Sequence, residues 1–90
     1  MITLKSAHEI ELMRRAGKIT AAARAAARDM VKPGVTTQQI DKAVHRFITE
    51  QGAIPSFLHY NGYPASVCVS VNDEIIHGIP GKRVLQEGDI

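Results

Sequence analysis

The sequence changes character at Pro55, and this change limits the chain to a mixed α+β fold. Helix formers such as Ala, Arg, Leu and Gln dominate before Pro55, whereas β-branched residues, aromatics, Gly and Pro dominate after it. We therefore expect two helices followed by short antiparallel strands and tight turns. No linker divides the 90 residues, so they belong to one domain at most.

A capping box predicts the start of the first helix. In Ser6-Ala7-His8-Glu9, the Ser hydroxyl and the Glu carboxylate can each accept a hydrogen bond from a free N–H group of the first turn. The helix should end at Pro33-Gly34. Apolar residues recur along it at spacings of four and three, which predicts one buried stripe: Leu12, Ala16, Ile19, Ala23, Ala26 and Met30.

The second helix is predicted from Thr36 or Thr37, either of which can cap it, to Gly52. Its buried stripe is narrower and consists of Ile40, Val44, Phe47 and Ile48.

The second half carries one clearly alternating segment, Ser66–Val71, which predicts a strand with its three valines facing the core. Ser66, Cys68 and Ser70 should share the other, semi-polar face. Asn72-Asp73 predicts a turn into Glu74–His77, and Gly78 to Gly81 should break regular structure directly after the histidine. A turn at residues 87–89 should lead into a further strand, so we expect the domain to continue beyond Ile90.

Composition excludes several classes of protein. With 44% hydrophobic and 22% charged residues, the chain has the composition of a globular protein, and a net charge of +2 is too small for a nucleic-acid-binding surface. No uninterrupted apolar run predicts a membrane span or signal peptide. Cys68 is the only cysteine, so no internal disulfide can form, and we expect a cytoplasmic protein.

His77 is the strongest catalytic candidate. A histidine at a strand end, followed by Gly78 and a nearby proline, can be held facing a cleft, where it exchanges protons near neutral pH. The alternative is a structural or surface histidine, which is the more common role of a lone histidine.

Three aromatic residues and a thiol lie close together in the sequence: Phe57, Tyr60, Tyr63 and Cys68. Such a cluster can line an apolar slot, and the soft sulfur of Cys68 suits a thioether ligand such as methionine. The alternative is that the aromatics form the core beneath the sheet. A nucleophilic role for Cys68 is less favoured, because no base is evident beside it.

The chain shows no spacing typical of a metal site. Its histidines, His8, His45, His59 and His77, form neither an H-x-x-x-H nor an H-E-x-x-H pattern, and the acidic residues are scattered. We therefore predict no metal ligand among these residues.

Several ordered motifs give the chain a family resemblance. It resembles the type I methionine aminopeptidases in its helical segments, Met13-Arg14-Arg15-Ala16-Gly17 and Val31-Lys32-Pro33-Gly34-Val35-Thr36. The second half resembles them in Tyr60-Asn61-Gly62-Tyr63-Pro64, Ser66-Val67-Cys68, Ser70-Val71-Asn72-Asp73-Glu74 and His77-Gly78-Ile79-Pro80.

The resemblance implies the N-terminal half of the pita-bread fold, with residues 1–90 as the incomplete N-terminal part of a single catalytic domain. It implies that His77 contacts the substrate near the scissile amide and assists turnover. It also implies a methionine pocket formed by Phe57, Tyr60, Tyr63 and Cys68, whereas Asn61 stands where such proteins have either His or Asn.

The same resemblance implies metal-dependent removal of N-terminal methionine from nascent proteins. Two divalent ions of the Co, Mn, Fe or Zn class would be bound by two aspartates, a histidine and two glutamates beyond Ile90, so we expect the isolated chain to be inactive. Two alternatives are a non-enzymatic pita-bread binding protein and a related X-Pro peptidase.

The expected partners are peptides and nascent chains that begin with Met, with no membrane partner and a monomeric complete protein. Docking near ribosomal RNA through basic residues of the first helix is a further hypothesis, against which a solvated helix face is the simpler explanation. These residues are Arg14, Arg15, Lys18 and Arg28.

Overall fold

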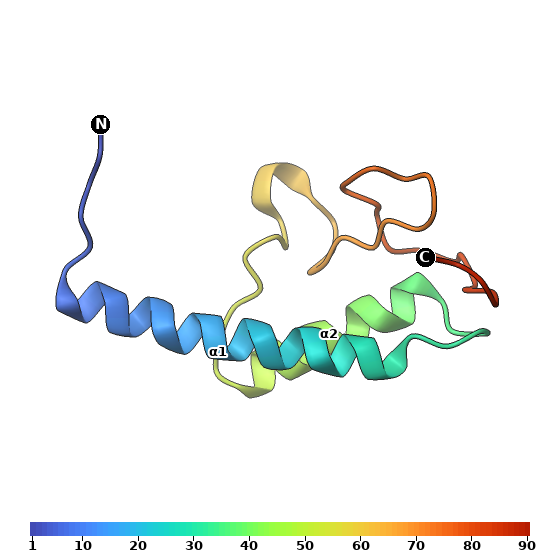
Figure 1. The fold of residues 1–90 in the computed structure, drawn as a ribbon, viewed down its shortest axis with the longest axis horizontal. Coiled ribbons are helices and arrows are strands. Elements are labelled where there is room, and N and C mark those ends of the chain that lie inside the picture. The colour runs from blue at the N-terminus through green and yellow to red at the C-terminus, as the bar shows by residue number, and fades with distance from the viewer.

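The computed structural model describes residues 1–90 and contains two α-helices and one short 3-10 helix. In chain order these are α1 (Ala7–Met30), α2 (Thr37–Glu50) and η1 (Tyr60–Gly62). The two α-helices form one layer, and the second half of the chain lies on one side of that layer (Figure 1). Neither α-helix is both long and apolar enough to cross a bilayer.

Both helices begin where the sequence predicted, and each begins with a capping box, although only that of α1 was predicted. At α1, Ser6 Oγ accepts from the Glu9 N–H at 3.1 Å, and Glu9 Oε1 accepts from the Ser6 N–H at 2.8 Å. The hydrogen bond from the Ser6 backbone keeps the pKa of Glu9 below its ordinary value. At α2, Thr36 and Gln39 exchange the same pair of bonds, so Thr36 is the cap. A cap of this kind stabilises a helix by about 1 kcal/mol.

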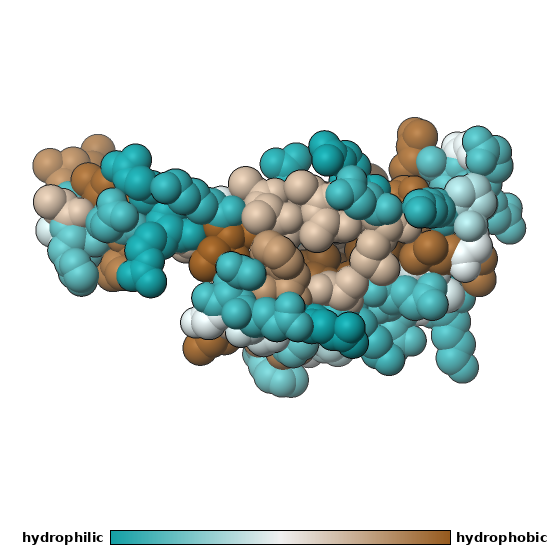
Figure 2. All heavy atoms as spheres, turned by 90° about the horizontal axis from the view of Figure 1, so that it is seen from below, coloured by the Kyte–Doolittle hydropathy of each residue, from teal (hydrophilic) through white to brown (hydrophobic).

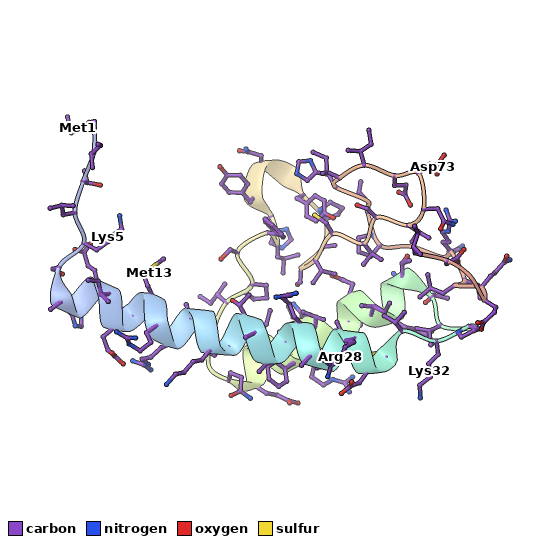
Figure 3. The ribbon with its side chains drawn as sticks, viewed as in Figure 1. Met1, Lys5, Met13, Arg28, Lys32 and Asp73 are labelled. Atoms are coloured by element: carbon purple, nitrogen blue, oxygen red, sulfur yellow. The ribbon has the colours of Figure 1, made fainter.

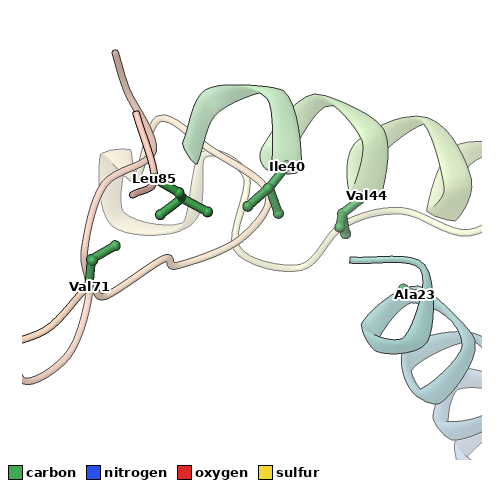
Figure 4. Packing of buried hydrophobic residues seen from close by; sticks show 5 residues of the cluster. All are labelled: Ala23, Ile40, Val44, Val71 and Leu85. Carbon is green, nitrogen blue, oxygen red and sulfur yellow. The ribbon is translucent and has the colours of Figure 1, made fainter. Parts of the chain in front are cut away.

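The core lies between α1, α2 and two segments of the second half (Figure 4). Its buried members are Ala23, Ile40, Val44, Val71 and Leu85. The predicted stripe of α2 is confirmed, because Phe47 and Ile48 pack against this cluster from the same helix. Val67 and Val69 also pack against it, as the alternation of Ser66–Val71 predicted.

Only the C-terminal part of the predicted α1 stripe is buried, which corrects the expectation for Leu12 and Ala16. Leu12 remains 47% exposed and Ala16 is also exposed, whereas Ala23 is 4% exposed. The reason is length: the N-terminal part of α1 extends past the rest of the chain, and Figure 3 shows Met13 in that part. Met1 and Lys5 lie on a segment that leads still further away (Figure 3).

No strand forms in the second half, which corrects the prediction for Ser66–Val71 and Glu74–His77. A strand requires successive backbone bonds to a neighbour. In this chain only a turn bond, from the Glu74 N–H to the Val71 carbonyl at 3.2 Å, joins the two segments directly, and the Val69 N–H donates to the carbonyl of Gly78, just after the second segment, at 2.8 Å. Other N–H groups bond to side chains instead, so His77 lies in irregular backbone and not at a strand end.

The residues after Pro80 return to the start of α2. The Leu85 N–H donates to the Val35 carbonyl and the Gly34 N–H to the Leu85 carbonyl, both at 2.8 Å. The isolated antiparallel bridge between Thr36 and Val84 belongs to this contact. Gly34 adopts φ +94°, a left-handed conformation that glycine accommodates without steric cost.

Both predicted turns of the second half form, and they lie against each other. Asn72 Nδ2 donates to Asp89 Oδ1 at 2.9 Å, and Asn72 Oδ1 accepts from the Ile90 N–H at 3.0 Å. The bond from Asn72, together with one from the Gln86 N–H, lowers the pKa of Asp89 below its ordinary value.

Candidate functional site

The structure brings together all the side chains that the sequence marked as a candidate site. Phe57, Tyr60, Tyr63, Cys68 and His77 line one open pocket of about 500 Å³. This volume is within the range of ligand-binding clefts, about 300 to 1,000 Å³. The remaining walls, which sequence reasoning did not assign to a pocket, are Asn61, Gly62, Pro64 and Ile79.

The aromatic residues form a wall and not the centre of a core. Phe57 and Tyr63 pack edge to face, with ring centroids 6.2 Å apart and planes inclined by 68°. Phe57 is 52% exposed and Tyr60 is 67% exposed, so the alternative of a core beneath a sheet is wrong for both. Exposed aromatic faces around a hollow are available to an apolar ligand.

The Tyr63 hydroxyl bonds to the residues next to two members of the pocket, Cys68 and His77. It lies 2.9 Å from the Val67 carbonyl and 3.3 Å from the Gly78 carbonyl, to which it donates. Burial of the phenol, followed by the hydrogen bond and charge of Cys68, raises the pKa of Tyr63 to about 12. The hydroxyl therefore keeps its proton throughout the neutral range and remains a donor.

Cys68 lies on the wall between this pocket and a larger apolar hollow of about 700 Å³. The larger hollow is bounded by α1, α2 and residues 66–69, and Ala27, Val44 and Val67 are among its lining residues. Figure 2 shows the molecule from the helical side, where a mostly hydrophobic area in the middle is bordered by hydrophilic residues. Cys68 is partly buried and its thiol is free.

His77 is exposed at the pocket and has a left-handed backbone with φ +57°. Its neighbour Gly78 is buried, donates to Ser70 Oγ at 3.0 Å, and accepts from the Val69 N–H at 2.8 Å. A Cβ on Gly78 would overlap the Val69 carbonyl and lie 2.9 Å from Ser70 Cα. Glycine is therefore required after His77, because any side chain would push this loop off the wall that carries Cys68.

Two side chains of α2 hold the other end of that wall. Asp41 Oδ1 accepts from the Ser66 N–H at 2.8 Å and from the Val67 N–H at 3.1 Å. His45 Nδ1 lies 2.8 Å from Ser66 Oγ, one turn further along the helix. Sequence reasoning missed both residues.

Thr37, on the same side of α2, holds the loop that follows His77. The Gly81 N–H donates to Thr37 Oγ1 at 2.8 Å, and the Thr37 hydroxyl lies 3.2 Å from the Gly81 carbonyl. Thr37, Asp41 and His45 are spaced by four residues, which is the signal that could have identified them as one polar row beside Ile40 and Val44.

No group of side chains in this chain is arranged to hold a metal ion by itself. Nowhere do three or more His, Cys, Asp or Glu side chains come close enough together to hold one. Asp89, the acidic residue nearest the end of the chain, uses its two carboxylate oxygens to accept from Asn72 and Gln86. The pocket residues themselves offer aromatic surface to a ligand and, in the His77 imidazole, a group that can exchange protons.

Comparison with known proteins gives consistent results. Residues 11–90 match metallopeptidase family M24. The chain is 51% identical over 90 residues to methionine aminopeptidase 1 of Bacillus subtilis, covering 100% of this chain and 36% of the relative. It is 57% identical over 81 residues to methionine aminopeptidase 1D, chloroplastic/mitochondrial, of Arabidopsis thaliana, covering 90% of this chain and 23% of that protein.

Solved structures agree with these matches. The methionine aminopeptidase of Thermotoga maritima superimposes with a TM-score of 0.96 at 40% identity, and that of Rickettsia prowazekii with 0.95 at 42% identity. Each comparison covers 99% of this chain and 36% of the solved chain. The pita-bread fold is thus confirmed, and the chain spans about a third of the length of these relatives. On its sequence and its fold, this chain belongs to metallopeptidase family M24.

Proposed function

We propose that the protein containing this chain removes N-terminal methionine from peptides by metal-dependent hydrolysis. Residues 1–90 would be part of its single catalytic domain and would supply the methionine pocket together with His77. The observation that carries the proposal is the gathering of three aromatic rings, Cys68 and His77 around one pocket. The names of the relatives, which are methionine aminopeptidases, support the same substrate.

The pocket is chemically suited to a methionine side chain. Phe57, Tyr60 and Tyr63 offer apolar surface to an unbranched thioether, and sulfur makes favourable contacts at the edges of aromatic rings. Cys68 adds a polarizable wall, and Tyr63 keeps its hydroxyl occupied with backbone carbonyls. The Tyr63 hydroxyl therefore needs no hydrogen-bond partner from the ligand.

His77 would act on the substrate at the exposed edge of this pocket. An imidazole can donate or accept a proton near neutral pH, so it can hydrogen-bond to the peptide next to the cleaved amide. Such a contact accelerates the reaction only to the extent that it strengthens in the transition state. Loss of the imidazole should therefore lower kcat more than it weakens substrate binding.

Two divalent ions of the Co, Mn, Fe or Zn class would supply an activated water to the reaction. Residues of this chain are not arranged to hold them, so a polypeptide of these 90 residues alone should release no methionine, even with metal added. Absence of a dependence on divalent metal in the complete protein would refute this part of the proposal.

The partners would be peptides and nascent chains that begin with methionine, acted on by a monomer in the cytoplasm. Docking near ribosomal RNA is the further hypothesis for Arg14, Arg15, Lys18 and Arg28, all of which are exposed. Arg14 pairs with Glu11 at 3.3 Å and Arg28 with Asp29 at 3.4 Å, which favours a solvated helix face. Ribosome binding that survives reversal of these charges would remove the docking hypothesis.

The test is a peptidase assay on the protein that contains this chain, with Met-Ala-Ser and Ala-Pro-Ser peptides, after chelation and after return of divalent metal. We expect metal-dependent release of methionine. His77→Asn should lower kcat by about 100-fold, the lower range for a lost general acid or base. His59→Asn is the matched control, since His59 has a similar φ of +67° and does not line the pocket.

Asparagine is the replacement of choice because it tolerates the left-handed backbone at both positions. No methionine release with metal present would favour the non-enzymatic pita-bread binding protein, and preferential cleavage of Ala-Pro-Ser would favour the X-Pro peptidase. Unchanged activity of His77→Asn would refute the role of this histidine.

A further inference from the structure

We infer that Asp41 on α2 is a positioning residue for the pocket wall that carries Cys68, and thereby controls how selectively the pocket accepts methionine. This inference rests on the proposed function, since it concerns the same pocket. Asp41 does not line the pocket itself and acts only through the backbone that it binds.

The contact between Asp41 and the wall is specific. One carboxylate oxygen accepts from two successive N–H groups, those of Ser66 and Val67, at 2.8 Å and 3.1 Å. These N–H groups belong to the two residues directly before Cys68. Ser66 is only 6% exposed, so its N–H has little access to water if the carboxylate is removed.

Asp41 accepts hydrogen bonds from the backbone of this segment, as a neighbouring strand would in a sheet. Residues 66–71 form no strand, and their backbone contact with the loop after His77 is the single bond from Val69 to Gly78. Between Ser66 and Cys68, the backbone N–H groups are held by Asp41 of α2, and the Val67 carbonyl accepts from the Tyr63 hydroxyl. The position of the wall that carries Cys68 should therefore depend on Asp41.

The helix α2, from which these contacts are made, is itself fixed by the core. Ile40 and Val44, which flank Asp41 on α2, are 5% and 4% exposed and belong to the core. His45 adds a contact to Ser66 Oγ from the next turn, so the wall is bound at two levels of the same helix. The position of Cys68 is thus tied to the core through α2.

Loss of Asp41 should widen the range of side chains that the pocket accepts. If the segment before Cys68 shifts, the walls no longer match the width of an unbranched thioether, and binding of methionine weakens relative to that of leucine. A change that only destabilised the whole protein would instead reduce the active fraction, and with it the apparent kcat, equally for both substrates.

The experiment compares steady-state kinetics on Met-Ala-Ser and Leu-Ala-Ser for the parent, Asp41→Ala and Asp41→Asn, all in the protein that contains this chain. Asp41→Ala should raise KM for the methionine peptide about tenfold and lower the methionine-to-leucine preference in kcat/KM, with kcat changed by less than about twofold. Asp41→Asn keeps an accepting oxygen without the charge, so its KM should rise about threefold.

Asp29→Ala and Asp29→Asn are the matched controls. Asp29 is an exposed aspartate on α1 that bonds only to Arg28, and its variants should leave both KM and the preference unchanged. Hydrogen exchange of the segment around Ser66 and Val67, measured by mass spectrometry, should accelerate in Asp41→Ala and not in the Asp29 variants. If Asp41→Ala does not fold, Asp41→Asn carries the comparison.

Three results would overturn the inference, and they can be told apart. A parent protein that releases methionine, with Asp41 variants of unchanged KM and preference, overturns this inference alone. A fall in kcat that is equal for both peptides, with KM unchanged, reduces Asp41 to a general structural role. A parent protein without methionine release overturns the proposed function, and this inference with it.

Discussion

Replacing Gly78 with alanine should destabilise the protein and displace His77 from the pocket. Gly78 is buried directly after His77, and its backbone lies against that of Val69 and Ser70. A Cβ at this position would overlap the Val69 carbonyl, so the loop would have to move away from the wall. The neighbouring atoms belong to backbone, which cannot rotate aside as a flexible side chain can.

The magnitude follows from the contacts that this movement breaks. Gly78 takes part in two hydrogen bonds, its N–H with Ser70 Oγ at 3.0 Å and its carbonyl with the Val69 N–H at 2.8 Å. Each such bond contributes about 1 kcal/mol net, and relief of the overlap costs a further 1 to 3 kcal/mol, roughly. We expect the free energy of unfolding to fall by about 3 to 5 kcal/mol, a large part of the total stability of an ordinary domain.

The assay is urea unfolding of the protein that contains this chain, followed by far-ultraviolet circular dichroism, with methionine release measured in parallel. Gly81→Ala is the matched control, because a Cβ there would meet nothing nearer than the Ile79 carbonyl at 4.0 Å. The kcat of Gly78→Ala should fall, since the loop that moves carries His77. The control should keep both its stability and its kcat.

The reasoning would be refuted if Gly78→Ala unfolded at the same urea concentration as the parent with an unchanged slope. Equal destabilisation by Gly78→Ala and Gly81→Ala would also contradict it, because the cause would then be the loss of glycine flexibility and not the close approach to Val69.

Two further predictions concern a helix and a phenol. Gly17→Ala should raise the free energy of unfolding by about 0.5 to 1 kcal/mol, since Gly17 is inside α1 with no atom within 4 Å of an added Cβ, and thermal unfolding measures it. Because the pKa of Tyr63 is raised from 10.0 to about 12, its contribution to stability should be complete below pH 10 and be lost as the pH rises through 12. A near-ultraviolet absorbance titration should show this late ionisation and lose it in Tyr63→Phe, whereas its persistence in Tyr63→Phe would contradict the assignment.

Sequence reasoning succeeded where the decisive contacts are local. Each capping box lies within four consecutive residues, so the starts of both helices could be predicted, and the apolar spacing of α2 identified its buried side. The same spacing was wrong for the N-terminal part of α1, because periodicity shows which side of a helix is apolar and not whether anything packs against it.

The prediction of strands in the second half was wrong for a related reason. Alternation in Ser66–Val71 correctly predicted that its valines contact the core, but a strand also needs a neighbour that supplies successive backbone bonds. Whether such a neighbour exists is not a property of the segment itself.

The sequence by itself determined the two helices and the family resemblance, and it marked Phe57, Tyr60, Tyr63, Cys68 and His77 as candidates for the site. Only the tertiary structure decided that Phe57 and His77, 20 positions apart in the chain, line the same pocket, and that Phe57 is a wall and not a core residue. It also decided that Asp41 binds the backbone of Ser66 and Val67, which lie 25 and 26 positions further along the chain. Such contacts join segments that only the folded backbone brings together, so no local pattern records them, whereas caps and apolar stripes arise within a few residues of one another.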